Sequence, residues 1–264
     1  MDLSSHRPRG GPSEAISFDD LRGLRQEFTR FMLRHRFGME EIVTKLHILR
    51  DEFALMHETN PIEHVASRLK SPDSLAEKIQ RKGCEATWES ISAEITDIAG
   101  VRVTCSFVSD VYQVFDVLTS QQDVTLKEVR DYIVEPKPNG YRSLHALVEV
   151  PVYLSDGPVA VGVEVQLRTI AMDFWASLEH KIHYKYRGAV PVDLQDRLRE
   201  AAESANALDG RMESLHAEVR GLDESGVSGL SDDVRAELRA GDDLVPSERL
   251  LEELRRLADG PPLP

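Results

Sequence analysis

The sequence has little cysteine, no long apolar run and no excess of positive charge, and each shortage excludes a class of protein. Its two cysteines, Cys84 and Cys105, provide neither a disulfide framework nor a CxxC metal pair. Cys105 lies in the apolar segment VRVTCSF, so we expect it to be a small buried side chain. No apolar run is long enough to span a bilayer, and the first residues, MDLSSHRPRGG, lack the apolar core of a signal peptide. We therefore expect a cytoplasmic protein.

The net charge of −14 is spread unevenly over the 264 residues. Residues 191–264 carry −9 and residues 1–190 carry only −5, so the acidity is concentrated in the last quarter. This balance argues against general binding to DNA or to anionic membranes. The sequence also contains neither a GxxxxGKS/T loop nor a GxGxxG loop, so the common nucleotide-binding folds are not supported.

Hydrophobic periodicity indicates an α+β fold, in which a mixed sheet of about five strands is flanked by helices. Strands are expected over residues 62–70, 101–107, 123–134, 143–151 and 159–168. Helices are expected from Asp19 to Gly38, where we expect a break, and over residues 40–57, 72–82, 109–120 and 170–186. By composition, residues 1–16 are expected to be disordered, and residues 17–190 to form the main domain.

A long helix is expected over residues 191–222, followed by an acidic tail at 223–264. Its apolar residues recur at alternating steps of four and three, which is an a/d heptad seam: Leu194, Leu198, Ala201, Ala205, Leu208, Met212, Leu215, Val219 and Leu222. Such a helix packs either on its own domain or on a helix of another subunit. The narrow seam favours the second, and we interpret the segment as an oligomerisation helix.

Polar side chains alternate with apolar ones along two of the expected strands. Glu164, Gln166 and Arg168 project from one face of the strand 159–168, because side chains alternate across a strand. Arg102 and its alternate neighbours repeat this pattern on the strand 101–107. Such a face is either simply solvated or lines a binding site, and its repetition on a second strand favours a site.

Asp97 and Glu164 would form a Mg²⁺ site if the fold brings them together. Asp97 precedes a strand in the segment TDIAGVR, where the small Ala99-Gly100 pair permits close approach. In phosphate chemistry Mg²⁺ usually takes one or two carboxylates together with substrate phosphates. Each acid alone is more often an ordinary surface residue, so the hypothesis depends on their convergence.

A basic cluster lies earlier in the chain and consists of Arg68, Lys70, Ser74, Lys78, Arg81 and Lys82. Ser74, Lys78 and Arg81 are spaced at i, i+4 and i+7, which places them on one face of the helix 72–82. A helix start that bears a serine, with cations on the same face, suits a polyphosphate. A solvated basic helix is equally compatible with this segment alone.

A third cluster surrounds the turn signal Asn139-Gly140. Tyr141 would stack on a base, and basic residues nearby would bind its phosphates: Arg130, Lys137 and His145. Taken singly, a tyrosine in a hairpin is usually a packing residue and a lone histidine is usually structural. Phe174 and Trp175, on the helix 170–186, are interpreted as core residues.

Four motifs in order resemble the synthetase domain of RelA/SpoT-type alarmone synthetases: DIAGVRV, the stretch from RDYI to KPNGYRSLH, VEVQLRT and AMDFWASLEHKIHYKY. The resemblance runs over about residues 40 to 220 and is closest to the small RelQ/RelP group. It implies a nucleotidyltransferase-like synthetase fold and a Mg²⁺-dependent GTP diphosphokinase of the stringent response. Such an enzyme transfers the β,γ-diphosphate of ATP to the ribose 3′-hydroxyl of GDP or GTP, giving AMP and (p)ppGpp.

The resemblance also implies a role for each candidate residue. Asp97 and Glu164 match the Mg²⁺ ligands, and Glu164 matches the general base that acts on the 3′-hydroxyl. The ATP-binding positions are matched by Arg68, Ser74, Lys78, Arg81 and Arg102, and the arginines at 68 and 102 sandwich the adenine. The GDP- or GTP-binding positions are matched by Arg130, Lys137, Tyr141, His145, Gln166, Asp173 and Glu179, and Tyr141 stacks on the guanine.

Asp173 departs from the family pattern, which often has asparagine there. A carboxylate only accepts hydrogen bonds whereas an amide also donates them, so acceptor preference could differ. The resemblance further implies a homotetramer. An alternative is a catalytically inactive nucleotide- or RNA-binding regulator of the same fold, which would not need both Asp97 and Glu164. An alarmone hydrolase is disfavoured because the sequence has no His-Asp dipeptide.

Overall fold

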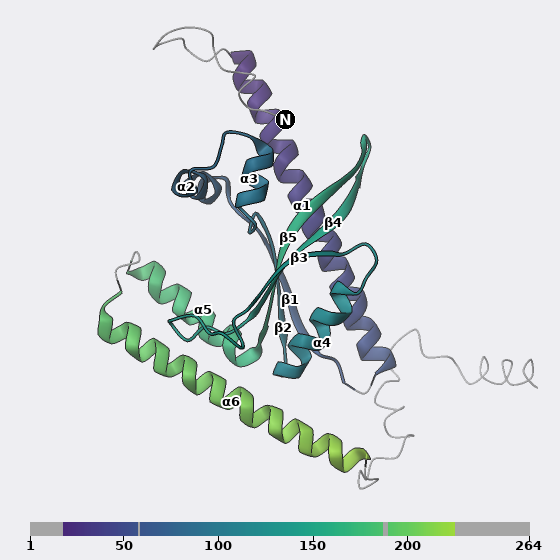
Figure 1. The fold of residues 1–264 in the computed structure, drawn as a ribbon, viewed down its shortest axis with the longest axis vertical. Coiled ribbons are helices and arrows are strands. Elements are labelled where there is room, and N and C mark those ends of the chain that lie inside the picture. Colours follow the sequence, from purple (N-terminus) through teal and green to yellow (C-terminus); the bar gives the residue numbers. More distant parts are fainter. Residues whose placement is uncertain (1–17, 58, 187–189, 225–264) are drawn as a thin grey trace, which may run out of the picture. The chain divides into compact units, whose positions relative to one another are not determined.

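The computed structural model describes residues 18–57, 59–186 and 190–224 of the chain (Figure 1). The chain divides into two units, residues 1–215 and 216–264, and the whole sheet belongs to the first. The disorder expected for residues 1–16, and the expected tail beyond Glu224, lie outside the described residues. No described helix is long and apolar enough to cross a membrane.

Helices and strands occur close to where periodicity places them. The helices are α1 (Phe18–Met56), α2 (Pro72–Lys82), α3 (Trp88–Glu94), α4 (Val108–Thr119), α5 (Ile170–Lys185) and α6 (Val192–Glu224). The strands are β1 (Ile62–Leu69), β2 (Ala99–Cys105), β3 (Thr125–Asp131), β4 (Leu144–Leu154) and β5 (Gly157–Thr169). All the expected strands are confirmed. Periodicity did not predict α3, because its 7 residues are too few for a helical pattern to repeat.

The strands form one sheet in the order β1-β2-β5-β4-β3. β2 and β5 pair in parallel and the other neighbours pair antiparallel, which confirms the mixed sheet. The chain reaches the central strand β5 last, after it has made both neighbours. This topology places the strand of Glu164 between the strands of Arg102 and His145.

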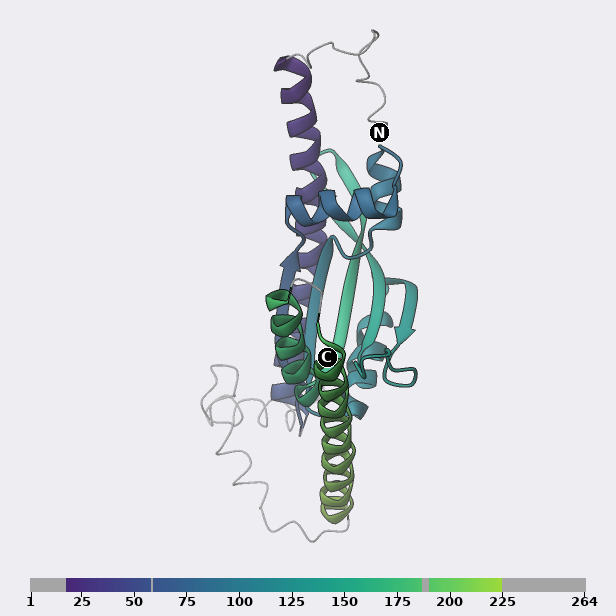
Figure 2. The same ribbon diagram turned by 90° about the vertical axis from the view of Figure 1, so that its left-hand side faces the viewer.

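One face of the sheet is the hydrophobic core, and α1 and α4 cover it (Figures 1 and 2). Alternate strand residues face these helices and are fully buried: Val101, Val103, Cys105, Val163, Val165 and Leu167. Burial contributes about 1.5–3 kcal/mol for each of the larger aliphatic residues. Since side chains alternate, the polar residues between them are turned to the opposite face. The buried Cys105 also confirms its expected role as a small apolar residue.

The helix break expected at Gly38 is wrong, because α1 runs without interruption from Phe18 to Met56. Gly38 is buried at the point where the helix crosses the sheet. A Cβ atom there would lie 2.6 Å from Cγ1 of Val161 on β5. A glycine inside a helix costs about 1 kcal/mol relative to alanine. Here that cost is offset because the missing side chain lets α1 approach β5 closely.

Two short helices support the start of β2. Ser71 caps α2 by accepting a hydrogen bond from the backbone of Ser74, and Pro72 occupies the first helical turn. Thr87 caps α3 in the same way. Side chains of α1, α2, α3 and the segment before β2 meet in a small second core: Phe31, Leu75, Ile91, Ile95 and Ile98. This packing fixes the backbone on both sides of Asp97.

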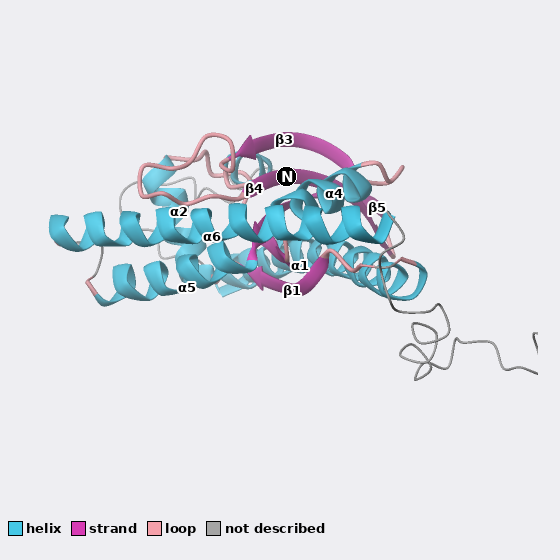
Figure 3. Cartoon of the chain, turned by 90° about the horizontal axis from the view of Figure 1, so that it is seen from below, coloured by secondary structure: helices cyan, strands magenta, loops and turns pink. Residues whose placement is uncertain are grey.

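α5 and the part of α6 that belongs to the first unit, residues 192–215, run side by side (Figure 3), and a third small core lies between them. Trp175 of α5 is only 4% exposed, and its indole donates to the backbone oxygen of Leu198 at 2.8 Å. Trp175 is therefore a core residue, as expected. Phe174 is 68% exposed, so its expected place in the core is wrong. Successive residues of a helix point about 100° apart, so the burial of Trp175 turns Phe174 away from the same core.

Candidate functional site

Strand pairing aligns the predicted residues on the polar face of the sheet. Across β1, β2, β5, β4 and β3, one row of paired positions is Arg68, Gly100, Glu164, Leu147 and Glu128. The next row is Ala66, Arg102, Gln166, His145 and Arg130. Residues that are far apart in the sequence are therefore neighbours on a single surface. Gly100 and Ala66 leave open space beside the two arginines with which they pair.

Two cavities hollow this surface. The first has a volume of about 270 Å³, and its polar lining comes from Ser67, Arg68, Lys70, Asp97, Arg102, Glu164 and Gln166. The second has a volume of about 490 Å³, and its lining includes Lys137, Asn139, Tyr141, Arg168, Glu179 and His180. Arg68, Arg102 and Gln166 line both cavities, so the two adjoin. The polar strand face is therefore hollowed and is more than a plain solvated surface.

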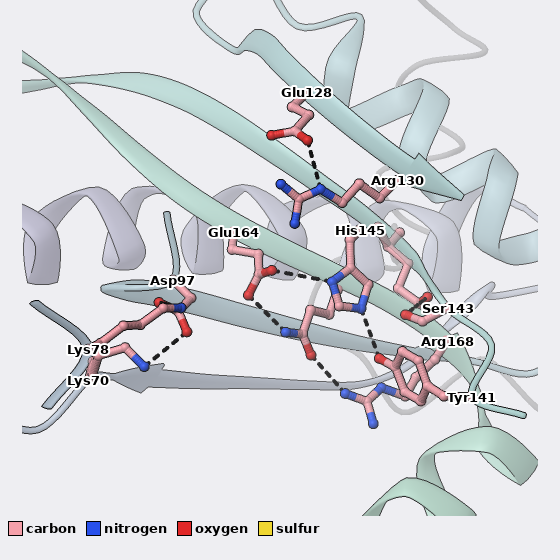
Figure 4. Close-up of polar contacts among 12 residues, drawn as sticks. Lys70, Lys78, Asp97, Glu128, Arg130, Tyr141, Ser143, His145, Glu164 and Arg168 are labelled. Atoms are coloured by element: carbon pink, nitrogen blue, oxygen red, sulfur yellow. Dashed lines mark hydrogen bonds and ion pairs between the residues drawn. The ribbon is translucent and has the colours of Figure 1, made fainter. Parts of the chain in front are cut away.

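Asp97 lies in the first cavity between two lysines (Figure 4). Lys70 Nζ is 2.9 Å from its Oδ2 and Lys78 Nζ is 2.8 Å from its Oδ1. Burial by itself raises the pKa of Asp97, but the two ammonium groups outweigh that effect, so the pKa lies below its ordinary value. Asp97 is therefore ionised at neutral pH, and both of its oxygens have a cationic partner.

Glu164 is part of a chain of polar contacts (Figure 4). Its carboxylate accepts a hydrogen bond from Gln166 at 2.9 Å and lies 3.3 Å from Nδ1 of His145. Beyond these, Nε2 of His145 is 2.9 Å from the Tyr141 hydroxyl, and Arg168 donates to Gln166 at 2.8 Å. Burial raises the pKa of Glu164, but the contacts with His145 and Gln166 outweigh it and lower the pKa. The contacts also fix the orientation of the carboxylate.

Tyr141 is 9% exposed, and cations surround its ring. Lys137 Nζ lies 4.8 Å from the ring centroid, and the Arg168 guanidinium lies 5.5 Å from it. The ring of Trp175 packs 6.4 Å away, measured between centroids. Both cations are within the range of a cation–π interaction, so they gather around the aromatic part of the second cavity.

Asp173 lies between two arginines of the site. Its Oδ1 is 3.4 Å from a guanidinium nitrogen of Arg102 and 3.4 Å from one of Arg168. The Nε atoms of both arginines are buried and have no hydrogen-bond partner among the described residues. Both guanidinium groups therefore keep a buried N–H group that no described side chain accepts a hydrogen bond from.

The remaining predicted residues divide into two groups. Glu179 lines the second cavity and accepts a hydrogen bond from Asn139 at 3.1 Å. Arg130 is exposed and paired with Glu128 at 2.7 Å, in a small hollow that His145 and Glu164 also line. Ser74 and Arg81 lie on α2 and line neither cavity, so the structure does not bring them to the site.

Three cavity residues that contact predicted ones were not assigned a role from sequence: Lys70, Asn139 and Arg168. Lys70 lies inside the basic cluster and Arg168 continues the alternation after Gln166, so both carried a signal. Asn139 was noted only as part of a turn. The contacts that distinguish these residues depend on the fold, because Lys70 meets Asp97 across 27 positions of sequence.

The carboxylates fit a hard divalent cation that shares its ligands with a substrate. Asp97 and Glu164 both line the first cavity, and oxygen is the ligand atom that Mg²⁺ prefers. Within the described residues, no group of three or more His, Cys, Asp or Glu side chains could hold a metal ion alone. These two carboxylates thus suit an ion that completes its shell with phosphate oxygens and water.

Residues 67–189 match the region found in RelA / SpoT proteins. The chain is 49% identical to the GTP pyrophosphokinase YwaC of Bacillus subtilis (strain 168) over 201 residues, covering 76% of this chain and 96% of that protein. It is 38% identical to the GTP pyrophosphokinase YjbM of the same strain over 195 residues, covering 74% and 91%. The matched region includes every candidate residue from Arg68 to Glu179.

Solved structures agree with these sequence matches. The crystal structure of the small alarmone synthetase 1 from Bacillus subtilis, bound to its product pppGpp, superposes with a TM-score of 0.69. Its sequence is 39% identical, and the match covers 74% of this chain and 98% of that one. The match thus extends over nearly the whole length of that protein.

Proposed function

Because the chain belongs to the RelA/SpoT family, as a small alarmone synthetase, we propose that it is a GTP pyrophosphokinase. It transfers the β,γ-diphosphate of ATP to the 3′-hydroxyl of GDP or GTP and releases AMP. The observation that carries the proposal is the pair of adjoining cavities, which share Arg68, Arg102 and Gln166. Two nucleotides bound there would meet beside Glu164. We expect the reaction to take place in the cytoplasm, within the stringent response.

ATP occupies the first cavity in this proposal. Arg68 and Arg102 lie on adjacent antiparallel strands, two positions out of register, and each pairs with a residue that has little or no side chain. Such diagonal neighbours are about 7–8 Å apart, which is about twice the 3.5–4.0 Å of atomic contact. A flat adenine fits between two guanidinium planes at that spacing. Lys70 and Lys78 are then placed to bind the phosphates.

GDP or GTP occupies the second cavity. Tyr141 offers its ring to the guanine, and Glu179 offers an acceptor to the donor groups of the base. Lys137 and Arg168 supply positive charge for the acceptor phosphates. Arg130 and His145 line a hollow beside Glu164, and Arg130 adds to this charge where the 3′-hydroxyl approaches.

Glu164 acts on the acceptor hydroxyl. Its carboxylate accepts the hydroxyl proton as the oxygen attacks the β-phosphorus of ATP and the bond to the α-phosphate oxygen breaks. A low pKa makes Glu164 a weak base, which suffices because a loose phosphoryl-transfer transition state requires little early proton removal. His145 and Gln166 hold the carboxylate in place. Mg²⁺, held by Asp97, Glu164 and the phosphates, would neutralise charge on the transferred group.

The direct test is turnover by the purified protein with ATP, Mg²⁺ and either GDP or GTP. AMP and a guanosine 3′-diphosphate are the expected products, separated by ion-exchange chromatography. The absence of both products with either acceptor would contradict the proposed function. An inactive regulator of the same fold would need neither carboxylate, whereas Asp97 and Glu164 are both present and line one cavity.

Replacing Glu164 tests the assignment of the base. Glu164→Gln should lower kcat by about 10²–10⁴-fold, as expected for the loss of a general base, without unfolding the protein. The matched control is Glu149→Gln, because Glu149 lies on β4, pairs with Lys127 at 3.0 Å and lines neither cavity. Near-normal turnover of Glu164→Gln, with a fold equal to the control, would show that another group acts on the hydroxyl.

We also propose that the chain forms a homo-oligomer through α5 and α6. An apolar groove of about 880 Å³ runs between these helices, and exposed side chains line it: Ile170, Phe174, Leu178, Leu208 and Met212. The two exposed groove residues on α6, Leu208 and Met212, belong to the heptad seam, so a second copy of this helix would cover them. A tetramer is the expected assembly.

A further inference from the structure

Both oxygens of Asp97 are taken by lysines that reach it from different elements. Lys70 follows β1, and its backbone N–H donates to the oxygen of Ile98 at 2.8 Å, which fixes its position beside Asp97. Lys78 extends from the middle of α2. Their ammonium groups lie 2.9 and 2.8 Å from the carboxylate. A divalent cation that binds either oxygen must therefore compete with an ammonium group that already neutralises part of its charge.

The charges around the first cavity also oppose a free divalent cation. Four positive charges come from Arg68, Lys70, Lys78 and Arg102, whereas three negative ones come from Asp97, Glu164 and the Arg102 partner Asp173. The side chains of Lys70, Lys78 and Asp97 are mostly buried, so water screens these charges only in part. The same excess of positive charge attracts a triphosphate, and the buried Nε of Arg102 still lacks a partner within the described residues.

We propose that Lys70 and Lys78 are exchangeable counter-ions, which hold Asp97 in the free enzyme and move to the ATP phosphates when the nucleotide binds. The carboxylate is then released to the metal at the moment when the phosphates arrive. This inference rests on the proposed function, and it gives Lys70 and Lys78 two successive partners, Asp97 in the free enzyme and the phosphates in the complex. Its consequence is that the metal and the nucleotide bind together, each poorly without the other.

A purely structural role for the two ion pairs makes a different prediction. In that case the lysines only tie α2 and the end of β1 to the start of β2. Their removal would lower thermal stability and bare Asp97 to the metal, but it would leave the affinity of the protein for an ATP analogue unchanged. Tighter metal binding without nucleotide, combined with weaker binding of the ATP analogue, therefore distinguishes the two roles.

The experiment measures binding of Mn²⁺, as a paramagnetic substitute for Mg²⁺, by electron paramagnetic resonance of the free ion. In the wild-type protein, a methylene-bridged ATP analogue should tighten Mn²⁺ binding about tenfold or more. Lys70→Met and Lys78→Met keep the apolar stem and remove the charge. Each should tighten Mn²⁺ binding without nucleotide by about tenfold and weaken binding of the analogue.

Two controls locate the effect at Asp97. Lys82→Met removes a lysine on the same helix whose ammonium contacts the backbone oxygen of Glu94, and it should bind Mn²⁺ like the wild type. Adding Asp97→Asn to Lys70→Met should abolish the gained affinity. If both folded lysine variants bind Mn²⁺ no more tightly than the wild type, or bind the ATP analogue as tightly as the wild type does, the counter-ion inference is overturned. Failure of the wild type to turn over would instead overturn the proposed function alone.

Discussion

Asp173 shows how a single carboxylate can tune the charge of the acceptor site. It lies 3.4 Å from both Arg102 and Arg168, so it partly neutralises two cations that line the second cavity. Asp173→Asn removes that charge and restores the amide that the family often has. The freed guanidinium of Arg168, which we assign to the acceptor phosphates, should favour the more highly charged acceptor. We expect the ratio of kcat/KM for GTP over GDP to rise about two- to fivefold, in line with weak, partly exposed ion pairs.

The measurement is steady-state kinetics with both acceptors at saturating ATP. Asp193→Asn is the matched control, because Asp193 is an exposed aspartate in the first turn of α6 and lines neither cavity. A ratio that stays within error of the wild type would mean that Arg168 does not contact the phosphate by which GTP and GDP differ.

For single residues, the sequence predicts which side chains share a face of the sheet better than it predicts which side chains they contact. The alternation around Glu164 predicts which side chains share a face, because a strand repeats every two residues. It does not predict that His145 and Gln166 would fix the carboxylate, since these contacts depend on strand order. Phe174 resembles a core residue by its type alone, and only the packing of Trp175 against α6 leaves it exposed.

At the scale of elements, the turn before β4 joins α6 to the acceptor site. Gly140 adopts φ +85°, which favours glycine, and a Cβ there would lie 2.7 Å from Cβ of Ala202 on α6. Tyr141, the next residue, belongs to the same small core as Ala202 and Trp175. Gly140→Ala should therefore destabilise the protein by about 1–3 kcal/mol and raise KM for GDP and GTP.

Chemical unfolding and acceptor kinetics measure the two effects. Gly210→Ala is the control, because a Cβ atom at this position of α6 would meet no neighbour within 4 Å among the described residues. Alanine there should be neutral or slightly stabilising. Adding Ala202→Gly to Gly140→Ala removes the overlap between the two Cβ atoms, so it should restore part of the lost stability. The rest of the loss should remain, because the backbone strain of alanine at φ +85° is unchanged. A variant with unchanged acceptor KM would show that the turn does not position Tyr141.

Over the whole molecule, local periodicity predicted the strands and most helices, and the resemblance supplied the fold that joins them. Two tightly packed glycines show what hydrophobic periodicity cannot predict. Gly38 is typical of a helix break and Gly140 of a turn, yet each also lets a helix approach the sheet or its loops. Such close approaches join elements distant in sequence, so local patterns do not reveal them. The convergence of Asp97 and Glu164 on one cavity likewise required the parallel pairing of β2 and β5.

The proposed oligomer is tested at the groove between α5 and α6, which we expect a second copy of the chain to cover. Leu208 and Met212 are 49% and 43% exposed on α6, and burial of each would contribute about 1.5–3 kcal/mol per copy. Leu208→Glu with Met212→Glu should dissociate the oligomer, because neither charge can be solvated inside a helical interface. Light scattering after gel filtration measures the mass. Ala207→Glu with Ser214→Glu adds the same charge at exposed positions of α6 that do not line the groove, and should leave the mass unchanged. A wild-type mass equal to one chain would contradict the proposed assembly.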